Sequence, residues 1–124
     1  MTFWVNHEGS CVACCVATLV GEHPADLPND GRTDDDRAAL NQWLQTRHGR
    51  RLEPIYGDSY DDMPKGLWIA LLHRRHNLNH AVLARGGTIV HDPALKNGAG
   101  HIGPGDLAYA HDRSMALGWR LAAT

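Results

Sequence analysis

The central stretch of the chain reads Asn79-His80-Ala81-Val82-Leu83-Ala84-Arg85-Gly86-Gly87-Thr88-Ile89-Val90-His91-Asp92-Pro93. Two apolar, strand-like runs flank the glycine pair, which is the pattern of a β-hairpin. His80 and Asp92 stand near the outer ends of the two runs. The sequence therefore predicts an antiparallel pair of strands that carries an imidazole and a carboxylate at one end.

The turn decides whether His80 and Asp92 share a face of this hairpin. Residues directly opposite in an antiparallel pair point to the same face, and successive residues alternate. A two-residue turn at 86–87 pairs Ala81 with Asp92 and sends His80 to the other face. A three-residue loop over 85–87 pairs His80 with Asp92. Only an odd-length loop or a β-bulge lets the two side chains meet, so a shared role predicts one of these features.

A second informative stretch is a predicted helix over residues 11–20, which begins with Cys11. Gly9 and Ser10 are suitable N-caps, and the apolar run that follows is too continuous for a solvated helix. A free thiol has a pKa of about 8.5, which a helix N-terminus and a nearby imidazolium lower toward the nucleophilic thiolate. Cys14 and Cys15 lie inside the helix, where we expect them to fill space.

These stretches resemble the small papain-like cysteine peptidase domains of the C39-like kind, which are found in phages and bacteria. The opening of these domains reads G-N-C-F-A-A-C-x-A-S-L-L. This chain has Gly9-Ser10-Cys11-Val12-Ala13-Cys14-Cys15-Val16-Ala17-Thr18-Leu19-Val20. The family's later block reads N-H-A-V-V-x-R-D-G-x-x-V-H-D-P-H-P, and this chain has Asn79-His80-Ala81-Val82 and Val90-His91-Asp92-Pro93.

The resemblance implies an α+β fold with a papain-like core, in which the N-terminal helix bearing the cysteine packs on an antiparallel β-sheet. It also implies a catalytic triad of Cys11 as nucleophile, His80 as base and Asp92 as orienting carboxylate. The implied activity is thiol-dependent hydrolysis of an amide or thioester bond in a peptide or protein substrate. His91 is expected to face away from His80 and to be structural.

The oxyanion hole is where the chain departs from the family pattern. The family uses the backbone N–H of the cysteine and usually a Gln side chain about six residues before it. This chain has Val5 there, and Asn6 is the nearest amide, so Asn6 is the expected oxyanion donor. The departure favours an alternative, a catalytically weak or inactive peptidase-like binding protein, for example a phage factor that engages a host protein. The retained Cys11, His80 and Asp92 favour activity.

A metal site is a competing interpretation of Cys11-x-x-Cys14-Cys15, because the chain also has nine histidines. Zinc sites that are readable from sequence need a second ligand pair at a defined spacing. None of the histidine pairs supplies it. We therefore expect no metal and no cofactor.

Composition predicts one small domain over residues 1–124, because 43% of the residues are hydrophobic. The net charge of −2 and the lack of a long basic block argue against a nucleic-acid partner. No apolar run has the length of a membrane span, and three cysteines fit a reducing compartment. These features predict a cytoplasmic protein of a bacterium or phage-infected host cell, with no membrane partner and an open oligomeric state.

The remaining pattern predicts three further elements. Thr33 should cap a helix that begins with an acidic first turn and that Gly49 ends. The apolar run 67–72 predicts a strand at the centre of the sheet. Residues 117–121 alternate enough to predict a last strand that closes the sheet.

Overall fold

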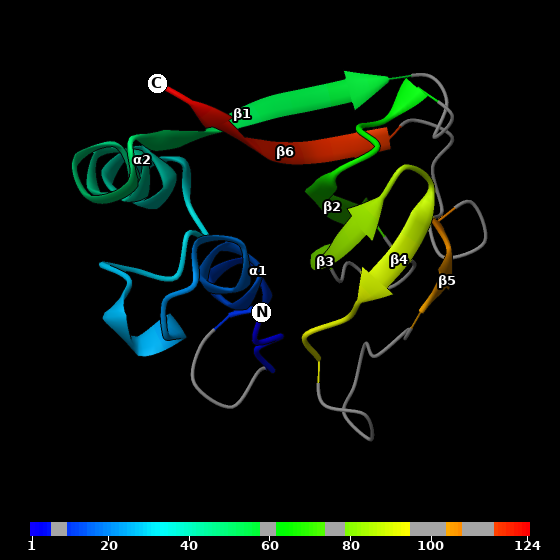
Figure 1. Cartoon of the computed structure of the whole chain (residues 1–124), viewed down its shortest axis with the longest axis horizontal. Coiled ribbons are helices and arrows are strands. Elements are labelled where there is room, and N and C mark those ends of the chain that lie inside the picture. Colours follow the sequence, from blue (N-terminus) through cyan, green and yellow to red (C-terminus); the bar gives the residue numbers. More distant parts are fainter. Residues whose placement is uncertain (6–9, 58–61, 74–78, 95–103, 108–115) are drawn as a thin grey trace.

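The computed structural model describes residues 1–5, 10–57, 62–73, 79–94, 104–107 and 116–124, and it has the α+β fold class predicted from the sequence (Figure 1). Its helices are α1 (Cys11–Val20), the short 3-10 helix η1 (Pro24–Asp26) and α2 (Asp34–His48). Its strands are β1 (Arg50–Gly57), β2 (Leu67–His73), β3 (Asn79–Arg85), β4 (Thr88–His91), β5 (Gly105–Asp106) and β6 (Ala116–Ala123). They form one antiparallel sheet in the order β1-β6-β2-β3-β4-β5.

Two strand predictions are confirmed, and one position is corrected. β2 lies inside the sheet as predicted, with β3 on one side and β6 on the other. β6 confirms the strand predicted at 117–121, but it lies between β1 and β2 and does not close the sheet. The edge position belongs to β1, which the sequence pattern did not predict. Leu52 is the only buried residue of β1, and its apolar residues Leu52, Ile55 and Tyr56 do not alternate along the strand.

The helix boundaries follow the predicted caps. The Ser10 hydroxyl accepts a hydrogen bond from the Ala13 N–H at 3.1 Å and starts α1. The Thr33 hydroxyl does the same for the Asp36 N–H at 3.0 Å and starts α2, which ends at Gly49. Each such cap satisfies a donor that the helix itself cannot, which contributes about 1 kcal/mol.

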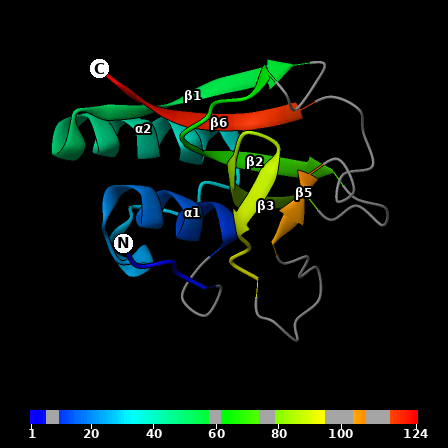
Figure 2. The ribbon, with the colours of Figure 1, turned by 45° about the vertical axis from the view of Figure 1, so that its right-hand side comes forward.

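Both helices lie on the same side of the sheet, as Figures 1 and 2 show. The apolar cluster between them and the sheet includes α1 residues, Leu40 and Leu44 of α2, and Ile69, Ala81 and Leu83 of the sheet. The other face of the sheet carries a second cluster around Trp68, Val82 and Leu107. Each large side chain buried in this way contributes about 1.5–3 kcal/mol. The first cluster presses α1 against β3, and this packing positions the site described below.

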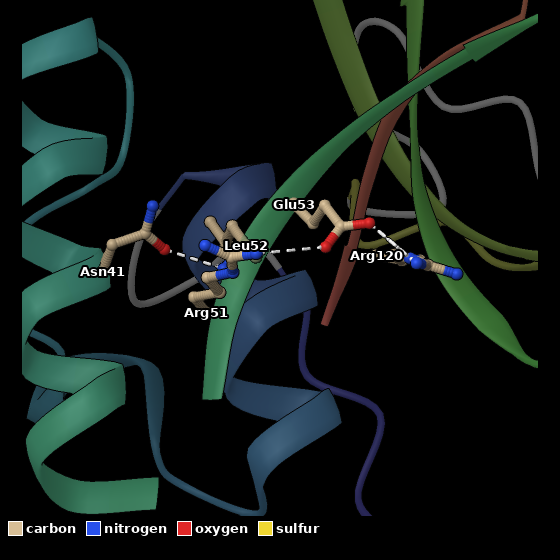
Figure 3. Close-up of polar contacts among 5 residues, drawn as sticks. All are labelled: Asn41, Arg51, Leu52, Glu53 and Arg120. Carbon is tan, nitrogen blue, oxygen red and sulfur yellow. Dashed lines mark hydrogen bonds and ion pairs between the residues drawn. The ribbon is translucent and has the colours of Figure 1, made fainter. Parts of the chain in front are cut away.

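Polar contacts join α2 to the exposed edge strand β1 (Figure 3). The Asn41 side-chain oxygen accepts a hydrogen bond from the Leu52 N–H at 2.7 Å, so this amide is not left open at the edge. Glu53 accepts a hydrogen bond at 2.7 Å from Arg120, its partner residue on β6. Satisfied amides and charged side chains are features that limit pairing of an edge strand with another chain.

Candidate active site

A β-bulge in the β3–β4 hairpin places Asp92 on the same face as His80. The alternative predicted from the sequence, a three-residue loop that pairs His80 directly with Asp92, is wrong. Gly86 has a φ of 52°, which suits the first position of a two-residue turn at Gly86-Gly87. The observed pairs are Arg85 with Thr88, Ala84 with Ile89, and Leu83 with His91. Val90 is therefore the extra residue, and it shifts the residues that follow by one position. This shift turns Asp92 to the face of His80.

The His80 and Asp92 side chains form a short, enclosed contact. The His80 Nε2 atom lies 2.6 Å from the Asp92 Oδ1 atom, and the two residues are 7% and 5% exposed. The same Oδ1 atom accepts a hydrogen bond from the Ala94 N–H at 2.9 Å. Asp92 is thus held by its own backbone turn while it orients the imidazole ring.

Cys11 meets this pair from the N-terminus of α1. Its Sγ atom accepts a hydrogen bond from the Ala81 N–H at 3.4 Å, and its interaction with the neighbouring His80 lowers the pKa of the thiol. Because His80 Nε2 faces Asp92, Nδ1 is the ring nitrogen that remains for the sulfur. The fold therefore brings together the three residues that the sequence predicted as a triad, from α1, β3 and the end of β4.

The electrostatic environment favours a charged Cys11–His80 pair. Burial acts to raise the pKa of the Cys11 thiol, but the hydrogen bonds from His80 and Ala81 and the charge of His80 outweigh it, so the pKa falls below its ordinary 9.0. Burial acts to lower the pKa of His80, yet its hydrogen bonds to Asp92 and Cys11 raise that pKa to about 9. Both shifts favour the charged pair, a thiolate beside an imidazolium, relative to the same two groups free in water.

Cys14 and Cys15 occupy the interior as expected, each with 0% exposure. Burial, and next the charge of Cys11, raise the pKa of Cys14 to about 11. Burial likewise raises the pKa of Cys15 well above its ordinary value. The Cys14 Sγ atom donates a hydrogen bond to the Val5 carbonyl at 3.4 Å. Only Cys11 of the three thiols is both accessible and activated.

The N-terminal residues bridge α1 and β4 beside the triad. His91 faces away from His80 and donates a hydrogen bond from Nε2 to the Trp4 carbonyl at 2.7 Å. Its ring also lies 5.1 Å from the ring of Phe3. The Trp4 N–H donates to the Thr18 hydroxyl at 3.1 Å, so the same residue is attached to the helix that bears Cys11.

Two contacts of the site could not be read from residue types. The Ala81 donor is a backbone group, and the Trp4 acceptor lies 87 positions from His91 in the sequence. The adjacency of Ala81 to His80 was the only available signal for the first. The predicted oxyanion donor Asn6 lies outside the described residues.

The described part of the chain contains no group of three or more His, Cys, Asp and Glu side chains arranged to hold a metal ion. Within the same ranges, no helix combines the length and apolar character that a membrane span requires.

Comparisons with protein-family models, with curated proteins and with solved structures found no match to this chain.

Proposed function

We propose that the chain is a papain-like cysteine hydrolase of the C39-like kind, which acts on an amide or thioester bond of a peptide or protein. The observation that carries the proposal is the 2.6 Å contact between His80 and Asp92, with the Cys11 sulfur hydrogen bonded to the N–H of Ala81, the residue after His80. An accessible thiol, a base and a buried orienting carboxylate are the parts that nucleophilic thiol catalysis requires.

In the proposed reaction the Cys11 thiolate attacks the substrate carbonyl carbon, and the carbonyl oxygen becomes an oxyanion. The N–H of Cys11 has no partner within α1, because it belongs to the first turn, so it can donate to that oxyanion. The His80 imidazolium then gives its proton to the leaving amine or thiol, which leaves an acyl group on sulfur. His80 next removes a proton from water, which attacks the thioester and restores the thiolate. Asp92 remains charged and holds the ring throughout.

The proposal needs no cofactor, since the three side chains supply the nucleophile, the proton carrier and the orienting group. All three cysteines are free thiols, which is consistent with a reducing compartment such as the cytoplasm. We place the protein there, with a peptide or protein as its partner and neither nucleic acid nor membrane.

The experiment that tests the proposal is the rate of iodoacetamide labelling of Cys11 between pH 4 and 10, with the labelled residue located by mass spectrometry. We expect an apparent thiol pKa below about 8.5 and rapid labelling at pH 7. Cys11→Ser should abolish rapid labelling, because Cys14 and Cys15 are enclosed. Hydrolysis of a panel of model thioesters and peptides by the wild type, absent in Cys11→Ser, should follow.

An ordinary labelling pKa in the wild-type protein would contradict the proposal. It would instead support the alternative of a binding protein on a peptidase-like scaffold, which the Val5 departure favours.

Asp92→Asn is expected to separate the charge of Asp92 from its role in orientation. The asparagine oxygen can still accept hydrogen bonds from Ala94 and His80, but the negative charge is lost. The pKa of His80 should therefore fall from about 9 toward its ordinary 6.5, as followed by NMR titration of the ring. Labelling of Cys11 at pH 7 should slow by up to about tenfold, and more in Asp92→Ala, which also removes the acceptor.

Asp92→Asn should also lower the free energy of unfolding, by an amount that depends on pH. A raised imidazole pKa stabilises the fold fully below pH 6.5, and this contribution is lost as the pH rises through about 9. The loss of unfolding free energy in Asp92→Asn should therefore be larger at pH 6 than at pH 9.5. An equal loss at both pH values would contradict the assigned charge coupling.

A further inference from the structure

Cys11 and Cys14 form a C-x-x-C pair at the start of one continuous helix. Residues three apart on a helix lie on neighbouring positions of its surface, with Cα atoms about 5 Å apart. This separation lies within the range that disulfides span. The two thiols are thus close enough to be joined with only local adjustment of the first turn of α1.

The two cysteines differ in the way that a reacting and a resolving thiol differ. Cys11 is half-buried, and its sulfur accepts a hydrogen bond from the Ala81 N–H at 3.4 Å. Cys14 is enclosed, and its thiol donates to the Val5 carbonyl at 3.4 Å. The charge of Cys11 acts on the Cys14 thiol, which is consistent with the short distance between them.

Cys15 is the less suitable partner. It lies four positions from Cys11, where helix geometry places the Cα atoms about 6 Å apart, so distance alone does not exclude it. Its side chain packs in the apolar cluster beneath α1, whereas Cys14 faces the N-terminal residues at Val5. A bond to Cys15 would have to pull its side chain out of this apolar cluster, to which Cys14 does not belong.

We propose that Cys11 and Cys14 are a dithiol–disulfide site that reacts with hydroperoxides. The hydroperoxide oxidises Cys11 first, and Cys14 then forms a disulfide with it. Reduction of this disulfide restores the Cys11 thiol. The proposal rests on the activated thiolate of the proposed function, but it does not require that the chain hydrolyse any substrate.

The chemical steps balance for hydrogen peroxide. The Cys11 thiolate attacks one peroxide oxygen, the O–O bond breaks, and the departing hydroxide takes the proton of the His80 imidazolium to form water. Cys11 is now a sulfenic acid. The Cys14 sulfur attacks the Cys11 sulfur, the S–O bond breaks, and the departing hydroxide takes the Cys14 proton as a second water. Two thiols are oxidised to one disulfide, and the peroxide is reduced to two waters.

The position of Cys14 favours disulfide formation over further oxidation of Cys11. A sulfenic acid without a neighbouring thiol proceeds to sulfinic acid, which ordinary thiols do not reduce. Cys11 is the first residue of α1, so its N–H makes no hydrogen bond within the helix and only its carbonyl takes part in that ladder. Closure onto Cys14 therefore disturbs only the first turn.

The experiment treats the reduced full-length protein with a small molar excess of hydrogen peroxide at pH 7. The protein is then denatured, and its remaining thiols are blocked with iodoacetamide. Disulfides are reduced, and the released thiols are labelled with N-ethylmaleimide and located by fragment-ion mass spectrometry. We expect N-ethylmaleimide on Cys11 and Cys14 and iodoacetamide on Cys15. Dithiothreitol should restore the rapid labelling of Cys11.

Two matched variants sharpen this result. Cys14→Ser should convert Cys11 to sulfinic or sulfonic acid, with recovery by dithiothreitol at least about tenfold lower than in the wild type. Cys15→Ser should still form the Cys11–Cys14 disulfide. Cys14→Ala serves in place of Cys14→Ser if the serine variant fails to fold, and the wild-type mapping depends on neither.

A Cys11–Cys15 disulfide, or irreversible oxidation of wild-type Cys11 at the rate of Cys14→Ser, would overturn the proposal. These outcomes are distinct from failure of the proposed function, which is measured by labelling of the reduced protein without peroxide. Rapid labelling without a Cys11–Cys14 disulfide would overturn only the dithiol site. An ordinary labelling pKa would overturn the activated thiolate on which both depend.

Discussion

Gly118→Ala is expected to prevent stable folding of the chain. A Cβ atom at this position would lie 1.9 Å from the Ile69 carbonyl oxygen, 3.0 Å from its carbonyl carbon and 3.1 Å from the Ala70 Cα atom. These are backbone atoms of β2, and β6 is paired on both sides, so neither strand can move aside without breaking hydrogen bonds. We expect the free energy of unfolding to fall by more than about 4 kcal/mol, a large part of the 5–15 kcal/mol typical of a domain.

Urea denaturation followed by far-UV circular dichroism measures this loss. Gly66→Ala is the matched control, because a Cβ atom there meets nothing within 4 Å and the backbone does not need a left-handed conformation. The control should change the unfolding free energy by less than about 1 kcal/mol. A wild-type-like transition for Gly118→Ala would show that β6 does not approach β2 as closely as described.

His80→Ala is expected to slow iodoacetamide labelling of Cys11 at pH 7, by up to about a hundredfold. The imidazole supplies a hydrogen bond and a positive charge that lower the pKa of Cys11, whereas burial acts to raise it. Without His80 the thiol pKa should return to 9.0 or above, where only about 1% is ionised at pH 7. The midpoint of the pH profile of labelling should rise by the same amount as the thiol pKa.

His91→Ala is the control for this prediction, because His91 adjoins the site but faces away from His80 and contacts Trp4 and Phe3. Its labelling pKa should remain that of the wild type. Circular dichroism must show both variants folded, since the loss of His80 leaves a buried carboxylate at Asp92. Equal labelling of His80→Ala and the wild type would mean that the imidazole does not activate Cys11.

Much of the fold could be predicted because its signals are local. Ser10, Thr33 and Gly49 define helix ends through contacts with residues no more than five positions away. The apolar run at 67–72 is short and continuous, as is typical of a strand buried on both faces. The edge strand β1 was missed because its support comes from Asn41 and from β6, neither of which is visible in its own pattern.

Some features of the candidate site are likewise local in the sequence, and others depend on tertiary structure. The order of Cys11, His80 and Asp92 and their positions at a helix start and on a hairpin are properties of the sequence. Whether the hairpin uses a three-residue loop or a bulge could not be chosen from Gly86 and Gly87, because both routes give the required parity. The 2.6 Å contact depends on the bulge at Val90.

By itself, the sequence determined the helix and hairpin that carry the reactive residue types, because caps, glycine turns and apolar periodicity act between near neighbours. The tertiary structure alone decided that β6 inserts between β1 and β2, that Val90 bulges, and that the Ala81 N–H meets the Cys11 sulfur 70 positions away. The contact between Ala81 and Cys11 arises because α1 packs against β3. Burial and charge then act between residues that are far apart in the sequence.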